Sequence, residues 1–268
     1  MATTTATAAM QHEVVSHTKW IEARKKFLAQ EKEFTRLRDE LSRQRRELPW
    51  EHVEKPYVFE GPRGRETFAD LFDGRSQLVI YHFMLGPGWA EGCKSCSYLA
   101  DHFDGVTIHL AHRDVTFVAV SHAPYAEIAA FKERMGWKFH WASSFGGDFN
   151  YDYNVSFGAE QRAQGEILYN YEMTQFPSEE APGASVFYKD EGGAIYHTYS
   201  AYARGLDILV GTYNFLDLVP KGRDEGALAH TMAWVRHHDK YESGYFVDAK
   251  TGWEHPKVEA KPACCSHD

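Results

Sequence analysis

Two cysteines three positions apart, Cys93 and Cys96, have the residue type and spacing that most directly indicate chemistry. They follow an apolar stretch, LVIYHFM over 78–84, and a Gly-Pro-Gly loop, and they begin a stretch with the character of a helix. The order strand, loop, C-x-x-C and helix is typical of a site that exchanges thiols and disulfides. We therefore predict that catalysis takes place at this pair.

The position of Cys93 at the start of a helix favours its thiolate. Unpaired N–H groups and the helix macrodipole stabilise an anion there, and Lys94 adds a nearby positive charge. Both effects lower the pKa of Cys93 from its usual value of about 8.5. Cys93 is thus the predicted nucleophile, and Cys96, one turn later and more buried, is the predicted resolving thiol. The proton acceptor for Cys96 stays open among Glu91, His82 and His122.

Other uses of the cysteines remain open. A C-x-x-C pair can be half of a zinc site, but a second pair with metal spacing is missing, and the vicinal Cys264 and Cys265 lie on a polar tail. The cysteines can also be incidental to a scaffold. His237, His238 and Asp239 form the densest histidine cluster, which we interpret as a solvated patch. We expect no metal and no cofactor.

Composition restricts the class of protein. The chain has 268 residues, 43% of them apolar, so it can form a globular core, and its net charge of -9 argues against nucleic-acid binding. It has no apolar run long enough to span a membrane. The first ten residues lack the features of a secretory signal. Four cysteines without such a signal indicate reduced thiols, so we expect a cytoplasmic protein.

Residues 17–48 have the pattern of one long helix, with large apolar side chains every seven residues. Ser16 or Thr18 is expected to cap its start, and Pro49 to end it. Residues 19–48 contain ten Lys or Arg and six Asp or Glu, a local charge of +4. The helix is either an interaction arm, which joins copies of the chain into a homo-oligomer or presents an anion-binding face, or it lies against the main domain, and we favour the second interpretation. The repeating apolar residues are Trp20, Phe27, Phe34, Leu41 and Leu48.

The rest of the chain alternates strands and helices. Strand, helix, strand, helix, strand predicts a parallel sheet, and a hairpin and a final helix follow. We therefore expect an α/β fold, a mixed sheet with helices on both faces. The expected organisation is a flexible segment 1–15, an N-terminal amphipathic helix 16–50, a main domain 51–220 and a C-terminal extension 221–268. The predicted strands are 77–83, 115–120, 137–143, 184–188 and 194–199, and the predicted helices are 97–109, 125–135 and 206–218.

The stretch WAEGCKSC over 89–96 resembles the thioredoxin active site, although Gly92 stands where thioredoxins have a second Trp and Lys94-Ser95 where they have Gly-Pro. Pro182 precedes a strand in the place of the thioredoxin cis-proline. Residues 117–144 are similar to a peroxiredoxin segment. The span 14–241 resembles a family of uncharacterised bacterial and fungal proteins described as thioredoxin-like dithiol-disulfide oxidoreductases. The landmarks include VIYHFM (79–84), GWAEGCKSCS (88–97), DFNYDYNVSF (148–157), HTYSAYARGLD (197–207) and MAWVRHHD (232–239).

This resemblance implies a thioredoxin-like fold of the peroxiredoxin-type branch and a dithiol-disulfide oxidoreductase. It implies Cys93 and Cys96 as catalytic residues and Trp89, Lys94 and Pro182 as substrate-binding residues. The expected partner is a thiol or disulfide, carried by a protein or by a small molecule. A Cys-dependent peroxidase, with Arg204 approaching Cys93, and a non-catalytic binding protein on the same scaffold remain alternatives.

Overall fold

The computed structural model describes residues 12–241, 246–248 and 252–254. An eight-stranded mixed sheet forms its centre, in the order β1-β10-β9-β4-β5-β6-β2-β3. Two further strand pairs, β7 with β8 and β11 with β12, lie outside it. The strands are β1 (Glu51–His52), β2 (Val58–Gly61), β3 (Gly64–Thr67), β4 (Gln77–His82), β5 (Val115–Ser121), β6 (His140–Ser143), β7 (Ile167–Tyr169), β8 (Glu172–Thr174), β9 (Gly183–Lys189), β10 (Ile195–Tyr202), β11 (Phe246–Asp248) and β12 (Gly252–Glu254).

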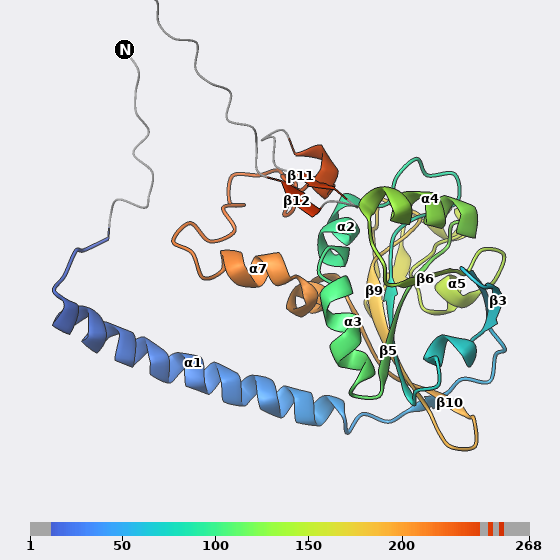
Figure 1. Cartoon of the computed structure of the whole chain (residues 1–268), viewed down its shortest axis with the longest axis horizontal. Helices are drawn as coiled ribbons and strands as arrows, with labels where there is room; N and C mark the ends of the chain where they lie inside the picture. The colour runs from blue at the N-terminus through green and yellow to red at the C-terminus, as the bar shows by residue number, and fades with distance from the viewer. Residues whose placement is uncertain (1–11, 242–245, 249–251, 255–268) are drawn as a thin grey trace, which may run out of the picture.

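The middle of the sheet follows the predicted order. Strands β4, β5 and β6 pair in parallel, and β9 pairs antiparallel with the other side of β4 and forms a hairpin with β10. Helices α2, α3 and α4 connect the parallel strands, as Figure 1 shows. This arrangement confirms the predicted thioredoxin-like α/β fold with a long N-terminal helix. The helices are α1 (His17–Arg45), α2 (Lys94–Ala100), α3 (Asp104–Ala111), α4 (Tyr125–Met135), α5 (Phe149–Asp152), α6 (Ala159–Ala163) and α7 (Gly211–Leu216), with short 3-10 turns η2 (Asp70–Phe72), η3 (Ala203–Leu209) and η4 (His238–Lys240).

The central strand β4 separates two hydrophobic cores, because alternate side chains of a strand point to opposite faces of the sheet. Tyr81 and Phe83 enter the first core, which also contains Cys96. Leu78 and Ile80 enter the second core, which is rich in phenylalanine. The cysteine pair therefore lies on the first face of the sheet.

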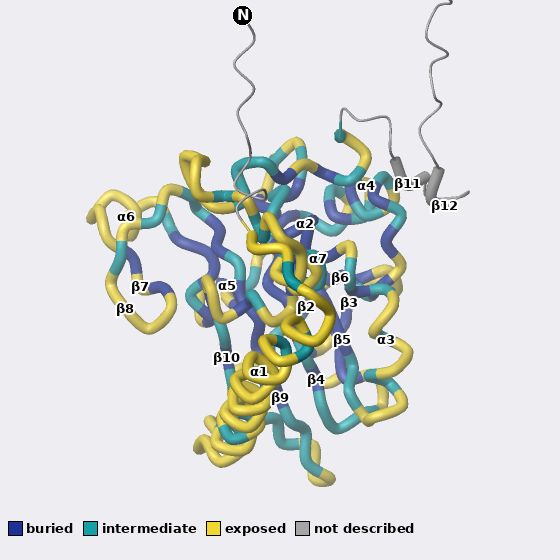
Figure 2. The backbone as a smooth tube through the Cα atoms, turned by 90° about the vertical axis from the view of Figure 1, so that its left-hand side faces the viewer, coloured by how far each residue is buried: buried dark blue, intermediate teal, exposed yellow. Residues whose placement is uncertain are grey.

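The N-terminal helix α1 projects from the body (Figure 1), and its surface is exposed along its length (Figure 2). Ser16 caps it as predicted, with its hydroxyl accepting from the Lys19 N–H at 3.4 Å. None of its residues is buried, so the expectation that it lies against the main domain is wrong. The physical reason is its composition. Charged residues that pair with each other along the helix, such as Arg36 with Glu33, cover most of the helix surface.

Two predicted helices are interrupted. The helix expected over 97–109 breaks into α2 and α3, because the Asp104 carboxylate accepts the backbone N–H groups of Lys138 and Phe139 at 2.9 and 2.7 Å. This contact ties the start of α3 to the segment before β6. The helix expected over 206–218 is divided between η3 and α7. The aromatic stretch 148–157 contains the short helix α5, which the sequence did not indicate.

Candidate active site at the cysteine pair

The cysteine pair lies where β4 leads into α2. Cys93 is the N-cap of α2, and its backbone N–H donates to the Met84 carbonyl at 3.0 Å, which holds the loop against the end of β4. Cys96 follows in the first turn and is buried, whereas Cys93 is partly exposed. Both thiols are free. The predicted placement of Cys93 at a helix N-terminus, with Cys96 behind it, is what the structure shows.

Local hydrogen bonds favour the thiolate of Cys93. The Cys96 thiol contributes most, and the N–H groups of Cys96 and Ser95 and the Ser95 hydroxyl add to it. Together they lower the pKa of Cys93 to about 6, although burial acts in the opposite direction. These contacts therefore favour the Cys93 thiolate, which is the form that attacks a disulfide.

Burial is the largest influence on the pKa of Cys96. It raises the pKa of the Cys96 thiol, and the hydrogen bond to Cys93 and the negative charge of Cys93 raise it further. The Tyr81 hydroxyl and the Met84 N–H both hydrogen-bond the Cys96 sulfur and stabilise its thiolate. Tyr81 itself is buried, and burial raises its pKa. Sequence reasoning missed Tyr81, although strand alternation places it on the same face as Phe83.

Gly92 is required by the close packing of the loop that precedes the cysteines. A Cβ atom at Gly92 would lie 2.6 Å from ring carbons of Phe83 and Phe131. The second Trp of thioredoxins therefore has no room here. This sequence departure is a packing feature of the site, which the amino-acid sequence alone did not explain.

Residues 232–240, which we call the clasp, fasten this loop from the C-terminal side. The His237 Nε2 donates to the Gly92 carbonyl at 2.8 Å, and this hydrogen bond is buried. Lys240 pairs with Glu91, and Val235 is fully buried in the first core. The interpretation of 237–239 as a solvated patch is therefore wrong for His237. As a buried hydrogen-bond donor to the Gly92 carbonyl, His237 has a structural role. The signal in the sequence for this role was the stretch MAWVRHHD over 232–239.

The three predicted substrate-binding residues have separate surroundings. The Trp89 indole packs against the first core together with Cys93, and its N–H donates to the Glu179 carboxylate at 2.7 Å. The Lys94 ammonium donates to the Ala233 carbonyl of the clasp at 3.4 Å. It is not among the main causes that lower the pKa of Cys93, which are hydrogen bonds.

Pro182 lies immediately before β9, but the expectation of a cis peptide bond is wrong. The described part of the chain contains no cis peptide. The segment enters β9 in extended form, because the Ala181 N–H donates to the Val155 carbonyl at 2.8 Å and the Pro182 carbonyl accepts from the Tyr169 hydroxyl at 2.8 Å. Pro182 has no N–H group, and its carbonyl already accepts one hydrogen bond from Tyr169.

The three candidate proton acceptors for Cys96 are all engaged elsewhere. His82 lies on the second face, where its Nε2 bonds the Ser185 hydroxyl at 2.8 Å, and burial lowers its pKa to about 3. His122 bonds the buried Glu180 carboxylate at 3.0 Å. Glu91 pairs with Lys240 and with Arg134, which lower the pKa of its carboxyl. Tyr81 is thus the polar side chain that replaces them beside Cys96.

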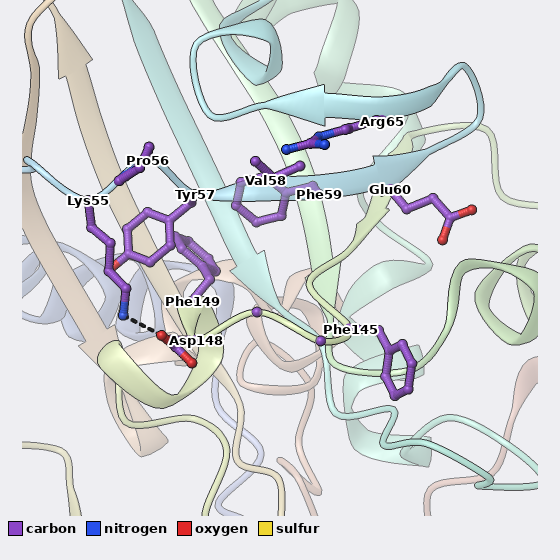
Figure 3. Close-up of a pocket in the computed structure, with 12 residues that line it drawn as sticks. Lys55, Pro56, Tyr57, Val58, Phe59, Glu60, Arg65, Phe145, Asp148 and Phe149 are labelled. Carbon is purple, nitrogen blue, oxygen red and sulfur yellow. Dashed lines mark ion pairs between the residues drawn. The ribbon is translucent and has the colours of Figure 1, made fainter.

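Two surface grooves lie away from the cysteines. Figure 3 shows one of about 530 Å³ between β2 and the 145–149 loop, in which Lys55 and Asp148 pair at 2.7 Å. A second, of about 720 Å³, is lined by Leu48 at the base of α1 and by Arg204. Arg204 pairs with Asp207 there, so this groove and not the thiol pair is its setting. No group of three potential metal ligands gathers within the described residues.

A thioredoxin-like sheet whose central strand leads into two free thiols of unlike acidity defines the class: a thioredoxin-like protein with a C-x-x-C dithiol site. The chain belongs to the family described as bacterial protein of unknown function (DUF899), whose model matches residues 9–241. This match confirms the resemblance to an uncharacterised family and carries no activity with it. No curated protein matches the sequence.

Several solved structures have a similar fold at low identity. Peroxidoxin BcpB from Mycobacterium tuberculosis is 13% identical, with a TM-score of 0.41 and coverage of 62% of this chain and 95% of that one. Peroxiredoxin Q from Xanthomonas campestris is 10% identical, with a TM-score of 0.39 over 63% and 98%. A candidate protein disulfide isomerase from Bacteroides thetaiotaomicron is 15% identical, with a TM-score of 0.35 over 62% and 91%. Similarities this weak carry no argument about function.

Proposed function

We propose that this protein is a dithiol-disulfide oxidoreductase in which Cys93 is the nucleophile and Cys96 the resolving thiol. The observation that carries the proposal is the unlike acidity of two thiols within one helical turn. The pKa of Cys93 is lowered to about 6, whereas burial raises that of Cys96. In a pair of this kind, one cysteine attacks as a thiolate, and the other stays protonated until the mixed disulfide has formed.

The reaction transfers two electrons from the protein to a disulfide. The Cys93 thiolate attacks one sulfur of the substrate disulfide, forms a mixed disulfide and releases the first substrate thiolate. Cys96 then loses its proton to that thiolate, with Tyr81 stabilising the new Cys96 anion by a hydrogen bond. The Cys96 thiolate attacks the Cys93 sulfur, which closes the intramolecular disulfide and releases the second substrate thiolate. Both steps reverse when the substrate is a dithiol.

The substrate in this proposal is a thiol or disulfide of a protein or small molecule. Trp89, which packs against the same core as Cys93, is the residue that we assign to substrate contact. Lys94 and Pro182 are further proposed contacts; the Lys94 ammonium also donates to the clasp, and the Pro182 carbonyl accepts from the Tyr169 hydroxyl. We place the protein in a reducing compartment such as the cytoplasm, where a free pair of this kind persists. No helix among the described residues has the length and apolarity to cross a membrane.

The test is thiol titration of the reduced protein before and after oxidised glutathione, in a background in which Cys264 and Cys265 are serine. We expect two thiols to disappear and to return with dithiothreitol. The Cys96→Ser variant should hold one glutathione on Cys93, detected by mass, and Cys93→Ser should hold none. Failure of the reduced and oxidised forms to interconvert would overturn the proposal. Peroxide consumption that requires Cys93 but not Cys96 would support a peroxidase instead.

A further inference from the structure

The helix α1 presents an apolar stripe that no described residue of its own chain covers. Its aromatic side chains are among the most exposed large apolar groups of the molecule, with Trp20 at 53% and Phe34 at 65% of full exposure. An exposed stripe of this length on a helix is typical of a surface that binds another protein surface. The stripe consists of Trp20, Phe27, Phe34, Leu37 and Leu41.

A second exposed apolar surface lies on the body. Phe215 of α7 and Leu218, two residues after its end, are 70% and 81% exposed, and Ile208 and Val219 are exposed beside them in sequence. Figure 1 shows α7 on the same side of the body as the free length of α1, without contact between the two helices. One chain thus carries two separate apolar surfaces, and neither is covered by the described residues of the same chain.

The charges of α1 and of the rest of the chain indicate which partner binds the stripe. Residues 19–48 carry +4, and because the whole chain carries -9, the remaining residues carry -13. A basic helix is therefore attracted to the acidic body of a second copy, whereas two such helices side by side would repel each other. This argues for helix-to-body contact over a coiled coil of two α1 helices.

Interface area indicates that the contact is made twice. A helix of 29 residues is about 44 Å long and about 10 Å wide, so one face covers at most about 440 Å². Stable interfaces bury about 800 Å² on each partner. Two symmetry-related contacts reach that area, and one contact does not.

We infer that two copies of this chain form a two-fold dimer in which the α1 stripe of each copy packs on the α7 surface of the other. The contact is isologous, because each copy supplies one stripe and one acceptor surface. This inference concerns assembly and is independent of the proposed thiol chemistry.

The experiment measures the mass of the full chain by light scattering after gel filtration, over a range of concentrations. We expect twice the chain mass for the wild type and a weaker dimer at high salt. Phe27→Ala with Phe34→Ala on the stripe should give a monomer that is as helical as the wild type by circular dichroism. The matched control, Leu28→Ala with Thr35→Ala, changes a neighbouring face at the same spacing and should stay dimeric.

The acceptor surface is tested separately. Phe215→Ala with Leu218→Ala should also give a monomer, whereas Val106→Ala with Ile108→Ala on exposed α3 should not. When the stripe variant and the α7 variant are mixed, one of the two contacts is intact, so the two chains should associate more weakly than the wild type. A monomeric wild type would overturn the inference. A dimer that survives the α7 substitutions, or a mixture that associates as tightly as the wild type, would also overturn it.

Discussion

The two thiols differ in acidity because of their nearest neighbours. Cys93 receives hydrogen bonds from Cys96 and Ser95, whereas Cys96 is enclosed in the first core. The neighbouring Lys94 is directed to the clasp. Short-range hydrogen bonds, and not the positive charge of Lys94, therefore lower the pKa of Cys93.

Removing the Cys96 thiol should make Cys93 less acidic. The Cys96→Ala variant loses the largest cause of the lowered pKa, so the midpoint should move from about 6 upward toward the usual value of about 8.5. The measurement is the rate of alkylation by iodoacetamide against pH, which follows the thiolate fraction. At pH 7 the rate should fall in proportion to that fraction.

The matched control is Cys96→Ser, which keeps a donor at the same position. Its midpoint should lie well below that of Cys96→Ala. Equal midpoints in the two variants would show that the Cys96 thiol is not what makes Cys93 acidic.

Gly92→Ala should destabilise the protein, because its Cβ atom would overlap the rings of Phe83 and Phe131. Overpacking of this kind costs about 1–3 kcal/mol in the free energy of unfolding, measured in urea. Gly105→Ala in α3 is the control, since a Cβ atom there meets open space. It should be neutral or stabilise by up to about 1 kcal/mol. A fully stable Gly92→Ala variant would contradict the packing described here.

Among the elements, the clasp determines the shape of the site as much as α2 does. It supplies His237 to the Gly92 carbonyl and Val235 to the first core, and its Asp239 pairs with Arg134 of α4 at 2.8 Å. The clasp thus joins the loop that carries Cys93 to the first core and to α4. The clasp is a part of the wall of the candidate site, formed by a segment without long regular structure.

His237→Ala should weaken the fold and loosen the loop. The variant leaves the buried Gly92 carbonyl without a donor, which costs about 1–3 kcal/mol in the free energy of unfolding. The alkylation rate of the buried Cys96 should increase at the same time. Exposed His230 is the control, and His230→Ala should change neither quantity. Unchanged Cys96 reactivity in His237→Ala would mean that the clasp does not shield the pair.

At the scale of the whole molecule, the sequence predicts the sheet better than the site. Alternation and apolar runs identify β4, β5, β9 and β10, because the pattern of apolar side chains along a strand is local in sequence. The C-x-x-C spacing identifies both cysteines for the same local reason. The neighbours that set their chemistry come from distant positions, such as Tyr81 on the preceding strand and His237 far toward the C-terminus.

The orientation of α1 could not be predicted either. Its heptad spacing describes a surface that binds something, and a helix against its own body and a helix against a second copy have the same pattern. The Pro182 prediction failed for a related reason. A proline before a strand fits either peptide isomer, and the contacts of Ala181 and Tyr169 that hold the extended form are not visible in sequence.

The sequence distance spanned by the clasp has a consequence for synthesis. His237 lies 145 positions after Gly92, so the ribosome adds that length of chain before the loop can be fastened. At 5–20 residues per second, this interval is about 7–30 seconds. A nascent chain therefore exposes both thiols to cellular oxidants and alkylating agents throughout that period, and pulsed alkylation of ribosome-bound chains should label Cys96 until the clasp has emerged.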